Sequence, residues 1–78
     1  MKKQYDFDSN IKSIICQNVR KYRKEKNVRL MDLAEAIGVT PDHLKRIESP
    51  TDRNNISLMC LYRISQVLEV GIDKFFEK

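Results

Sequence analysis

The sequence has 78 residues, of which 41% are hydrophobic and 33% are charged, and its formal net charge is +4. This length suits one domain with one modest core, so we expect no second regulatory domain, while the hydrophobic share is too high for a disordered chain. No run approaches the roughly 20 apolar residues that cross a bilayer, and the first ten residues lack the apolar core of a signal peptide, so we expect a cytoplasmic protein.

The positive charge is concentrated near the N-terminus. Residues 1–28 hold eight basic and three acidic side chains, whereas residues 29–78 hold seven basic and eight acidic ones. A local basic surface attracts polyanions, so nucleic acid and anionic membranes are the first partner classes to consider. An ordinary solvated helix face has the same composition, so charge alone leaves both interpretations open.

The first predicted helix starts near Asp8 or Ser9, either of which can cap it, and ends near Asn27. Its apolar residues recur at helical spacing: Ile11, Ile14, Ile15, Val19 and Tyr22. Its last two turns are rich in cations, which suit the negative end of a helix dipole: Arg20, Lys21, Arg23, Lys24 and Lys26. Because the apolar stripe is needed for the core, we do not expect this helix to bind a membrane.

Two short helices are predicted next, over residues 30–37 and 41–48. Gly38 ends the first of them, with Leu33, Ala34 and Ile37 on its apolar stripe. Thr40 can cap the second, and proline suits its first position, where Pro41 stands. Leu44 and Ile47 face inward, which leaves four polar residues on or beside the outer face: Asp42, His43, Lys45 and Arg46.

A polar, turn-rich loop over residues 49–55 precedes the fourth predicted helix, which Ser57 can cap. The inward stripe of this helix is Leu58, Leu61, Ile64, Ser65 and Leu68. Gly71 marks a break before a short fifth helix that holds Ile72, Phe75 and Phe76. We expect all five helices to share one core.

Two short helices joined by a tight glycine-containing turn form the helix-turn-helix pattern. The run NVRKYRKEKNVRLMDLAEAIGVTPDHLKRIE, residues 18–48, resembles the Cro and phage-repressor class of helix-turn-helix regulators, the XRE family. The resemblance continues through ISLMCLYRISQVLEVGIDKFF, residues 56–76. It implies an all-α, five-helix, lambda-repressor-like DNA-binding domain over residues 11–78, preceded by an N-terminal extension over residues 1–10, with the helix-turn-helix at helices two and three.

The resemblance implies a transcriptional regulator, a repressor, that binds a palindromic operator in double-stranded DNA as a homodimer through residues 41–48. Thr40 would cap this recognition helix, and five residues would occupy positions that contact bases and phosphates in the family: Pro41, Asp42, His43, Lys45 and Arg46. Arg46 can bind guanine with two hydrogen bonds, and Asp42 can accept from cytosine N4 or simply favour the positive end of the helix. Lys45 can bind phosphate or stay solvated. We expect no cofactor.

The family often pairs an arginine late in the first helix with the glutamate that ends the third, and Arg23 and Glu48 stand at those positions. We predict that they meet and fix the recognition helix to the first helix, while some guanidinium donors of Arg23 face phosphate. Removing one partner would strand the other charge.

The sequence departs from the family pattern in two places. The second helix usually opens with threonine and then a phosphate-binding glutamine, whereas Arg29 and Leu30 stand here, so its cap is weaker; Arg29 can restore a phosphate contact. The loop after Glu48 is about two residues longer than usual, and within it Arg53, Asn54 and Asn55 can bind phosphate or form a plain surface loop.

A competing interpretation is a protein-interaction module, such as an antitoxin that uses this fold to bind a toxin or an antirepressor, with DNA binding secondary. Tyr5 and Phe7 in the extension can serve such a partner or pack in a dimer interface. We do not expect an enzyme, because no nucleophile with a base, carboxylate pair or phosphate loop can be assembled. Cys16 and Cys60 lack metal-ligand spacing and should be free thiols.

Overall fold

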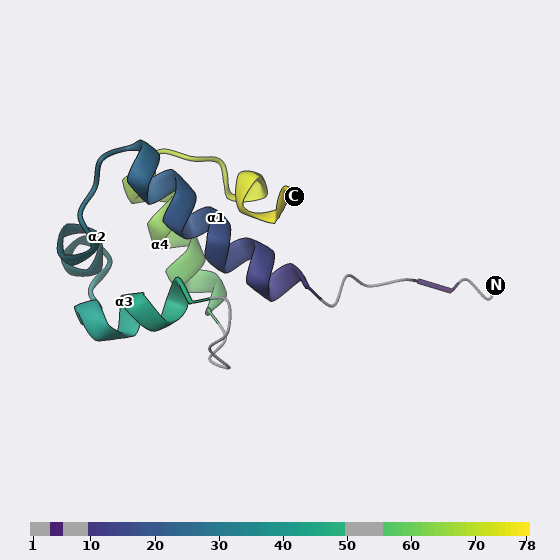
Figure 1. The fold of residues 1–78 in the computed structure, drawn as a ribbon, viewed down its shortest axis with the longest axis horizontal. Coiled ribbons are helices and arrows are strands. Elements are labelled where there is room, and N and C mark those ends of the chain that lie inside the picture. The colour runs from purple at the N-terminus through teal and green to yellow at the C-terminus, as the bar shows by residue number, and fades with distance from the viewer. Residues whose placement is uncertain (1–3, 6–9, 50–55) are drawn as a thin grey trace.

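The structure, a computed structural model, describes residues 4–5, 10–49 and 56–78, and every regular element in these ranges is helical. The elements are α1 (Ile11–Glu25), α2 (Leu30–Ile37), α3 (Pro41–Ile47), α4 (Leu58–Leu68) and η1 (Ile72–Phe76). In Figure 1, α1 runs across the molecule in front of α4, α2 and α3 lie together at one end, and η1 packs beside α1. None of the described helices is long and apolar enough to span a membrane.

The described ranges contain four α-helices and not the five that were predicted. The prediction is wrong for the fifth helix. The fifth predicted element is η1, a 3-10 helix of five residues. A segment this short gains few of the i to i+4 hydrogen bonds that stabilise an α-helix, and 3-10 geometry is typical of such short pieces. Its burial follows the prediction only in part, because Phe75 is fully buried whereas Ile72 and Phe76 are 36% and 45% exposed.

The ends of α1 differ from those predicted. Asn10 occupies the N-cap position and makes no side-chain cap hydrogen bond, and the predicted caps Asp8 and Ser9 lie outside the described residues. The helix ends at Glu25, two residues before the expected end, because Asn27 adopts a left-handed backbone conformation with φ 57° that no α-helix can continue through.

The turn between α2 and α3 is made as the sequence indicates. Gly38 closes α2 at φ 81°, a left-handed conformation that glycine adopts without a side-chain penalty. The backbone N–H of His43 donates to Oγ1 of Thr40 at 3.1 Å, so Thr40 caps α3, with Pro41 in the first turn. The helix ends at Ile47, one residue before the predicted end, because Glu48 is its C-cap.

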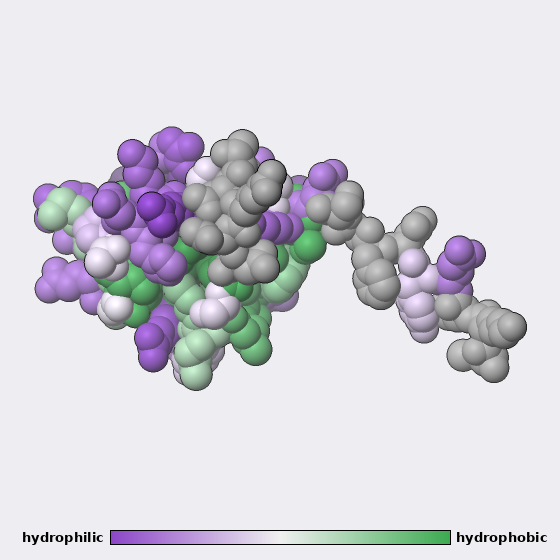
Figure 2. Space-filling view, turned by 90° about the horizontal axis from the view of Figure 1, so that it is seen from below, coloured by the Kyte–Doolittle hydropathy of each residue, from purple (hydrophilic) through white to green (hydrophobic). Residues whose placement is uncertain are grey.

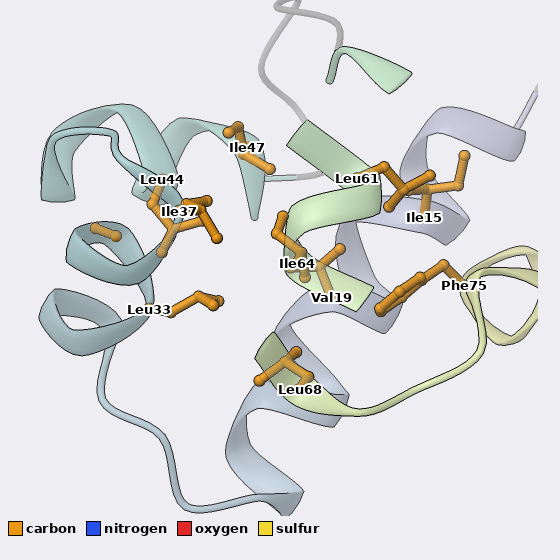
Figure 3. Packing of buried hydrophobic residues seen from close by; sticks show 11 residues of the cluster. Ile15, Val19, Leu33, Ile37, Leu44, Ile47, Leu61, Ile64, Leu68 and Phe75 are labelled. Atoms are coloured by element: carbon orange, nitrogen blue, oxygen red, sulfur yellow. The ribbon is translucent and has the colours of Figure 1, made fainter. Parts of the chain in front are cut away.

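One hydrophobic core joins all five elements, and Figure 3 shows its side chains converging from α2 and α3 on one side and from α1, α4 and η1 on the other. The residues of this core are Ile15, Val19, Leu33, Ala34, Ile37, Leu44, Ile47, Leu61, Ile64, Leu68 and Phe75. The ring of Phe75 meets that of Tyr22 edge to face, with centroids 5.8 Å apart. The side-chain amide of Asn18 donates to the backbone carbonyls of Phe75 at 2.8 Å and Glu77 at 2.7 Å, which fixes η1 to α1.

The helix α4 contributes Leu61, Ile64, Ser65 and Leu68 to the interior, and Ser57 caps it by accepting from the Cys60 N–H at 3.0 Å. Leu58 was expected on the same stripe, and this prediction is wrong: its side chain is 78% exposed. Leu58 is the first residue of α4, and its side chain lies outside the core that buries Leu61, one turn further along the helix. Cys16 and Cys60 form no disulfide.

Candidate nucleic-acid interface

The outer face of α3 is polar and open to solvent. Leu44 and Ile47 are buried beneath it, at 0% and 3% exposure, so they fix the rotation of the helix. The residues left exposed are Pro41, Asp42, His43, Lys45 and Arg46, which are the predicted contact residues of the recognition helix. Figure 2 views the molecule from the α3 side, and hydrophilic residues gather along its upper edge while hydrophobic residues gather along its lower edge.

The structure brings Arg23 and Glu48 together in a two-pronged ion pair. Nε of Arg23 donates to Oε2 of Glu48 at 2.7 Å, and Nη2 donates to Oε1 at 3.0 Å. The two side chains are only 12% and 6% exposed. The third guanidinium nitrogen, Nη1, donates to the backbone carbonyl of Val28 at 3.0 Å. One arginine thus joins the last turn of α1, the turn before α2 and the end of α3, which holds α3 at a fixed angle.

The N-terminus of α2 lacks the side-chain cap that a threonine would provide at this position. Arg29 is the N-cap residue and makes no side-chain cap bond. Its guanidinium, 80% exposed, instead donates to Oδ2 of Asp32 at 2.9 Å. This hydrogen bond, and then the negative charge of Asp32, raise the pKa of the Arg29 guanidinium. The proposed phosphate contact of Arg29 therefore has a carboxylate competitor one turn away, although the arginine stays accessible.

Two predicted contact residues, Arg53 and Asn54, lie outside the described residues, as does their neighbour Asn55. Phe7 of the extension is also outside, whereas Tyr5 is described and 61% exposed.

Three further polar side chains near the interface were not predicted as contact residues. Arg20 and Lys24 of α1 line hollows beside α3. Nη1 of Arg63 in α4 donates to the backbone carbonyl of Ile37 at 3.4 Å, at the end of α2. The four-residue spacing of Arg20 and Lys24 was a usable signal, because it places both on one face of a helix. The Arg63 contact has no comparable signal, since it depends on how α4 packs against α2.

A family model described as helix-turn-helix matches residues 19–75. The chain belongs to the Cro and phage-repressor class of helix-turn-helix proteins. The match covers α2, the turn, α3 and α4, together with the C-terminal half of α1 and most of η1.

Two relatives of this chain are described as transcriptional regulators. It is 35% identical over 65 residues to the HTH-type transcriptional regulator SinR of Bacillus subtilis (strain 168), an overlap of 83% of this chain and 58% of that protein. The chain thus spans little more than half the length of this relative, and 52% of SinR from Bacillus licheniformis.

Solved structures of other regulators share its fold. The clp gene regulator ClgR from Corynebacterium glutamicum has a TM-score of 0.77 and 26% identity, covering 83% of this chain and 67% of that one. SinR, the master regulator for biofilm formation, in complex with DNA has a TM-score of 0.71 and 36% identity, covering 81% of this chain and 98% of that one.

Proposed function

We propose that this chain is a sequence-specific DNA-binding transcriptional regulator, a repressor, that inserts α3 into the major groove of a roughly palindromic operator as a homodimer. The observation that carries the proposal is the exposed polar face of α3, held at a fixed angle by the Arg23–Glu48 pair. An α-helix fits the major groove, and a recognition helix reads bases only if its orientation is fixed. A relative of 36% identity has been solved with DNA, which supports the same class of ligand.

Within α3, side-chain chemistry assigns different roles to neighbouring residues. Arg46 has the planar donors that bind O6 and N7 of guanine together, a contact worth about 1 to 3 kcal/mol of discrimination. Lys45 and His43 offer single donors that suit phosphate oxygens or base edges. A carboxylate at the first turn, that of Asp42, can accept from cytosine while it also stabilises the positive end of the helix. The sequence preference therefore depends most on Arg46.

The experiment that tests this proposal is selection from a random duplex library with the full chain, followed by a salt titration on the enriched duplex. We expect one enriched motif with two related half-sites centred about one helical turn apart, and an affinity that falls steeply with salt. Arg46→Ala should relax the preference at one base position in each half-site. Arg63→Ala, which removes the same charge from α4, is the matched control and should leave the preferred sequence unchanged. No enriched motif, or salt-independent binding, would contradict the proposal.

A second candidate function is binding of a protein partner, with DNA binding secondary. The observation that favours it is the outer surface of α4, where Leu58, Met59 and Tyr62 are 78%, 60% and 51% exposed. Contiguous exposed apolar side chains are typical of interaction surfaces, and these can equally pack against a second copy of the chain. The same selection separates the two functions, because a chain that binds DNA only secondarily enriches no strong duplex motif.

A further inference from the structure

Two adjoining hollows lie where α1 meets the end of α3. The first, of about 420 Å³, is lined by Arg20, Arg23, Leu30, Lys45, Glu48 and Ser49. The second, of about 410 Å³, is lined by Gln17, Arg20, Lys21, Lys24 and Glu48. Because Arg20 and Glu48 belong to both linings, the hollows form one continuous depression beside the recognition helix.

The lining of this depression carries a large excess of positive charge. It holds five basic side chains and a single carboxylate, that of Glu48. Both carboxylate oxygens of Glu48 already accept from Arg23, so this acid neutralises Arg23 and no other cation. Among the residues that the structure describes, Arg20, Lys24 and Lys45 make no ion pair. Their charges therefore remain available to an anionic ligand.

The basic residues of α1 occupy a defined stripe. Gln17, Arg20 and Lys24 follow one another at helical spacing, so they share one face of α1. The Arg23–Glu48 pair fixes this face relative to α3. The major groove is about 12 Å wide, close to the diameter of an α-helix with its side chains, so elements beside an inserted helix meet the sugar-phosphate wall of the groove.

We propose that this depression is a second DNA-backbone site, in which Arg20 and Lys24 of α1 and Lys45 of α3 bind phosphodiester groups of one strand while α3 contacts the bases. The inference rests on the proposed function and extends the interface beyond the helix-turn-helix itself. Phosphate contacts fix register and orientation on the duplex and add affinity without sequence preference. The site therefore sets how deeply and at what angle α3 enters the groove.

The test is the salt dependence of duplex binding by the full chain, measured for wild type, Arg20→Gln, Lys24→Gln and the double variant on the enriched duplex and on an unrelated one. Each phosphate contact contributes about 0.9 to the slope of log affinity against log salt concentration. We expect each single variant to reduce the slope by about 1 and the double variant by about 2. If affinity at 1 M salt is unchanged, the double variant then binds about 60-fold more weakly at 0.1 M.

The charge-matched control is the double variant Lys26→Gln, Arg63→Gln, whose side chains line neither hollow. Its slope should stay within a few tenths of wild type. Thermal unfolding of the Arg20 and Lys24 variants should match wild type because both side chains are exposed. The control loses the contact of Arg63 with the Ile37 carbonyl, so all slopes are measured well below the unfolding midpoint of each variant. Equal slopes for the two double variants would overturn the inference. A library in which no duplex is enriched would instead refute the proposed function. The backbone site would still be tested in that case, because phosphate binding is independent of sequence. The salt slopes of the two double variants on the unrelated duplex would then support or overturn it.

Discussion

Replacement of Glu48 by alanine tests the central contact of this structure. Glu48→Ala removes both oxygens that accept from Arg23, whose side chain is only 12% exposed. The guanidinium would keep one hydrogen bond, to the Val28 carbonyl. Most of its charge would then be left in a poorly hydrated position, since removing one partner of a buried pair strands the other.

The expected loss of stability follows from this geometry. Stranding one partner of a buried ion pair costs about 3 to 5 kcal/mol. The remaining Val28 contact, and the hollow into which the Arg23 side chain can turn, favour the lower end, about 3 kcal/mol. A domain of this size has about 4 to 12 kcal/mol of unfolding free energy in total. At about 4 to 8 °C per kcal/mol, the midpoint of thermal unfolding should fall by about 12 to 24 °C.

Urea denaturation followed by far-UV circular dichroism measures this loss as a lower midpoint with an unchanged slope. Glu35→Ala is the matched control, because Glu35 is exposed on α2 and its loss should change stability by no more than about 0.5 kcal/mol. The double variant Arg23→Met, Glu48→Ala should be more stable than the sum of the two single losses predicts. A Glu48→Ala protein as stable as Glu35→Ala, or single losses that add, would refute the argument that the pair acts as a buried unit.

Three further predictions concern local structure. Thr40→Ala should cost about 1 kcal/mol of unfolding free energy by removing the α3 cap, whereas Thr40→Ser should keep most of it; equal urea midpoints for both variants would contradict the cap. Gly38→Ala should cost about 1 to 2 kcal/mol, because φ is 81° there and an added Cβ meets no atom within 4 Å, so the loss is purely conformational; an unchanged midpoint would argue against the left-handed turn. Burial raises the pKa of the Cys60 thiol, so at pH 8 a disulfide reagent should label Cys60 more slowly than a thiol in a small molecule, yet faster than buried Cys16. Faster labelling of Cys16 than of Cys60, measured in single-cysteine variants, would contradict this order.

The limits of α2 and the start of α3 were predictable because their causes are local. A glycine after the last apolar residue ends α2, and threonine followed by proline begins α3. The outward residues of α3 were equally predictable, since Leu44 and Ile47 fix which side of a short helix faces the core. The meeting of Arg23 and Glu48 was expected from the family resemblance and not from local pattern.

The features that the sequence did not predict depend on how distant elements pack. The spacing of Leu58 fits the inward stripe of α4, but periodicity cannot tell how far along a helix the core extends, and here it includes Leu61 and not Leu58. The hollows beside α3 exist because Arg20 and Lys45 face the same space. That arrangement depends on the angle between α1 and α3, which cannot be predicted from the sequence of either helix. The 3-10 form of η1 was missed for a different, local reason, because a five-residue segment carries too little periodicity to distinguish helix types.

The bonds from Asn18 to the carbonyls of Phe75 and Glu77 have a consequence for synthesis of the chain. They join residues 57 and 59 positions apart, so α1 cannot complete its packing until η1 has left the ribosome. At 5 to 20 residues per second, that delay is about 3 to 11 s. During this interval the apolar side of α1, including Ile15 and Val19, has no partner from η1 and is open to chaperones. Ribosome-bound chains truncated before Phe75 should therefore be cleaved by protease within α1, and chains with enough linker after Lys78 to bring η1 out of the exit tunnel should resist.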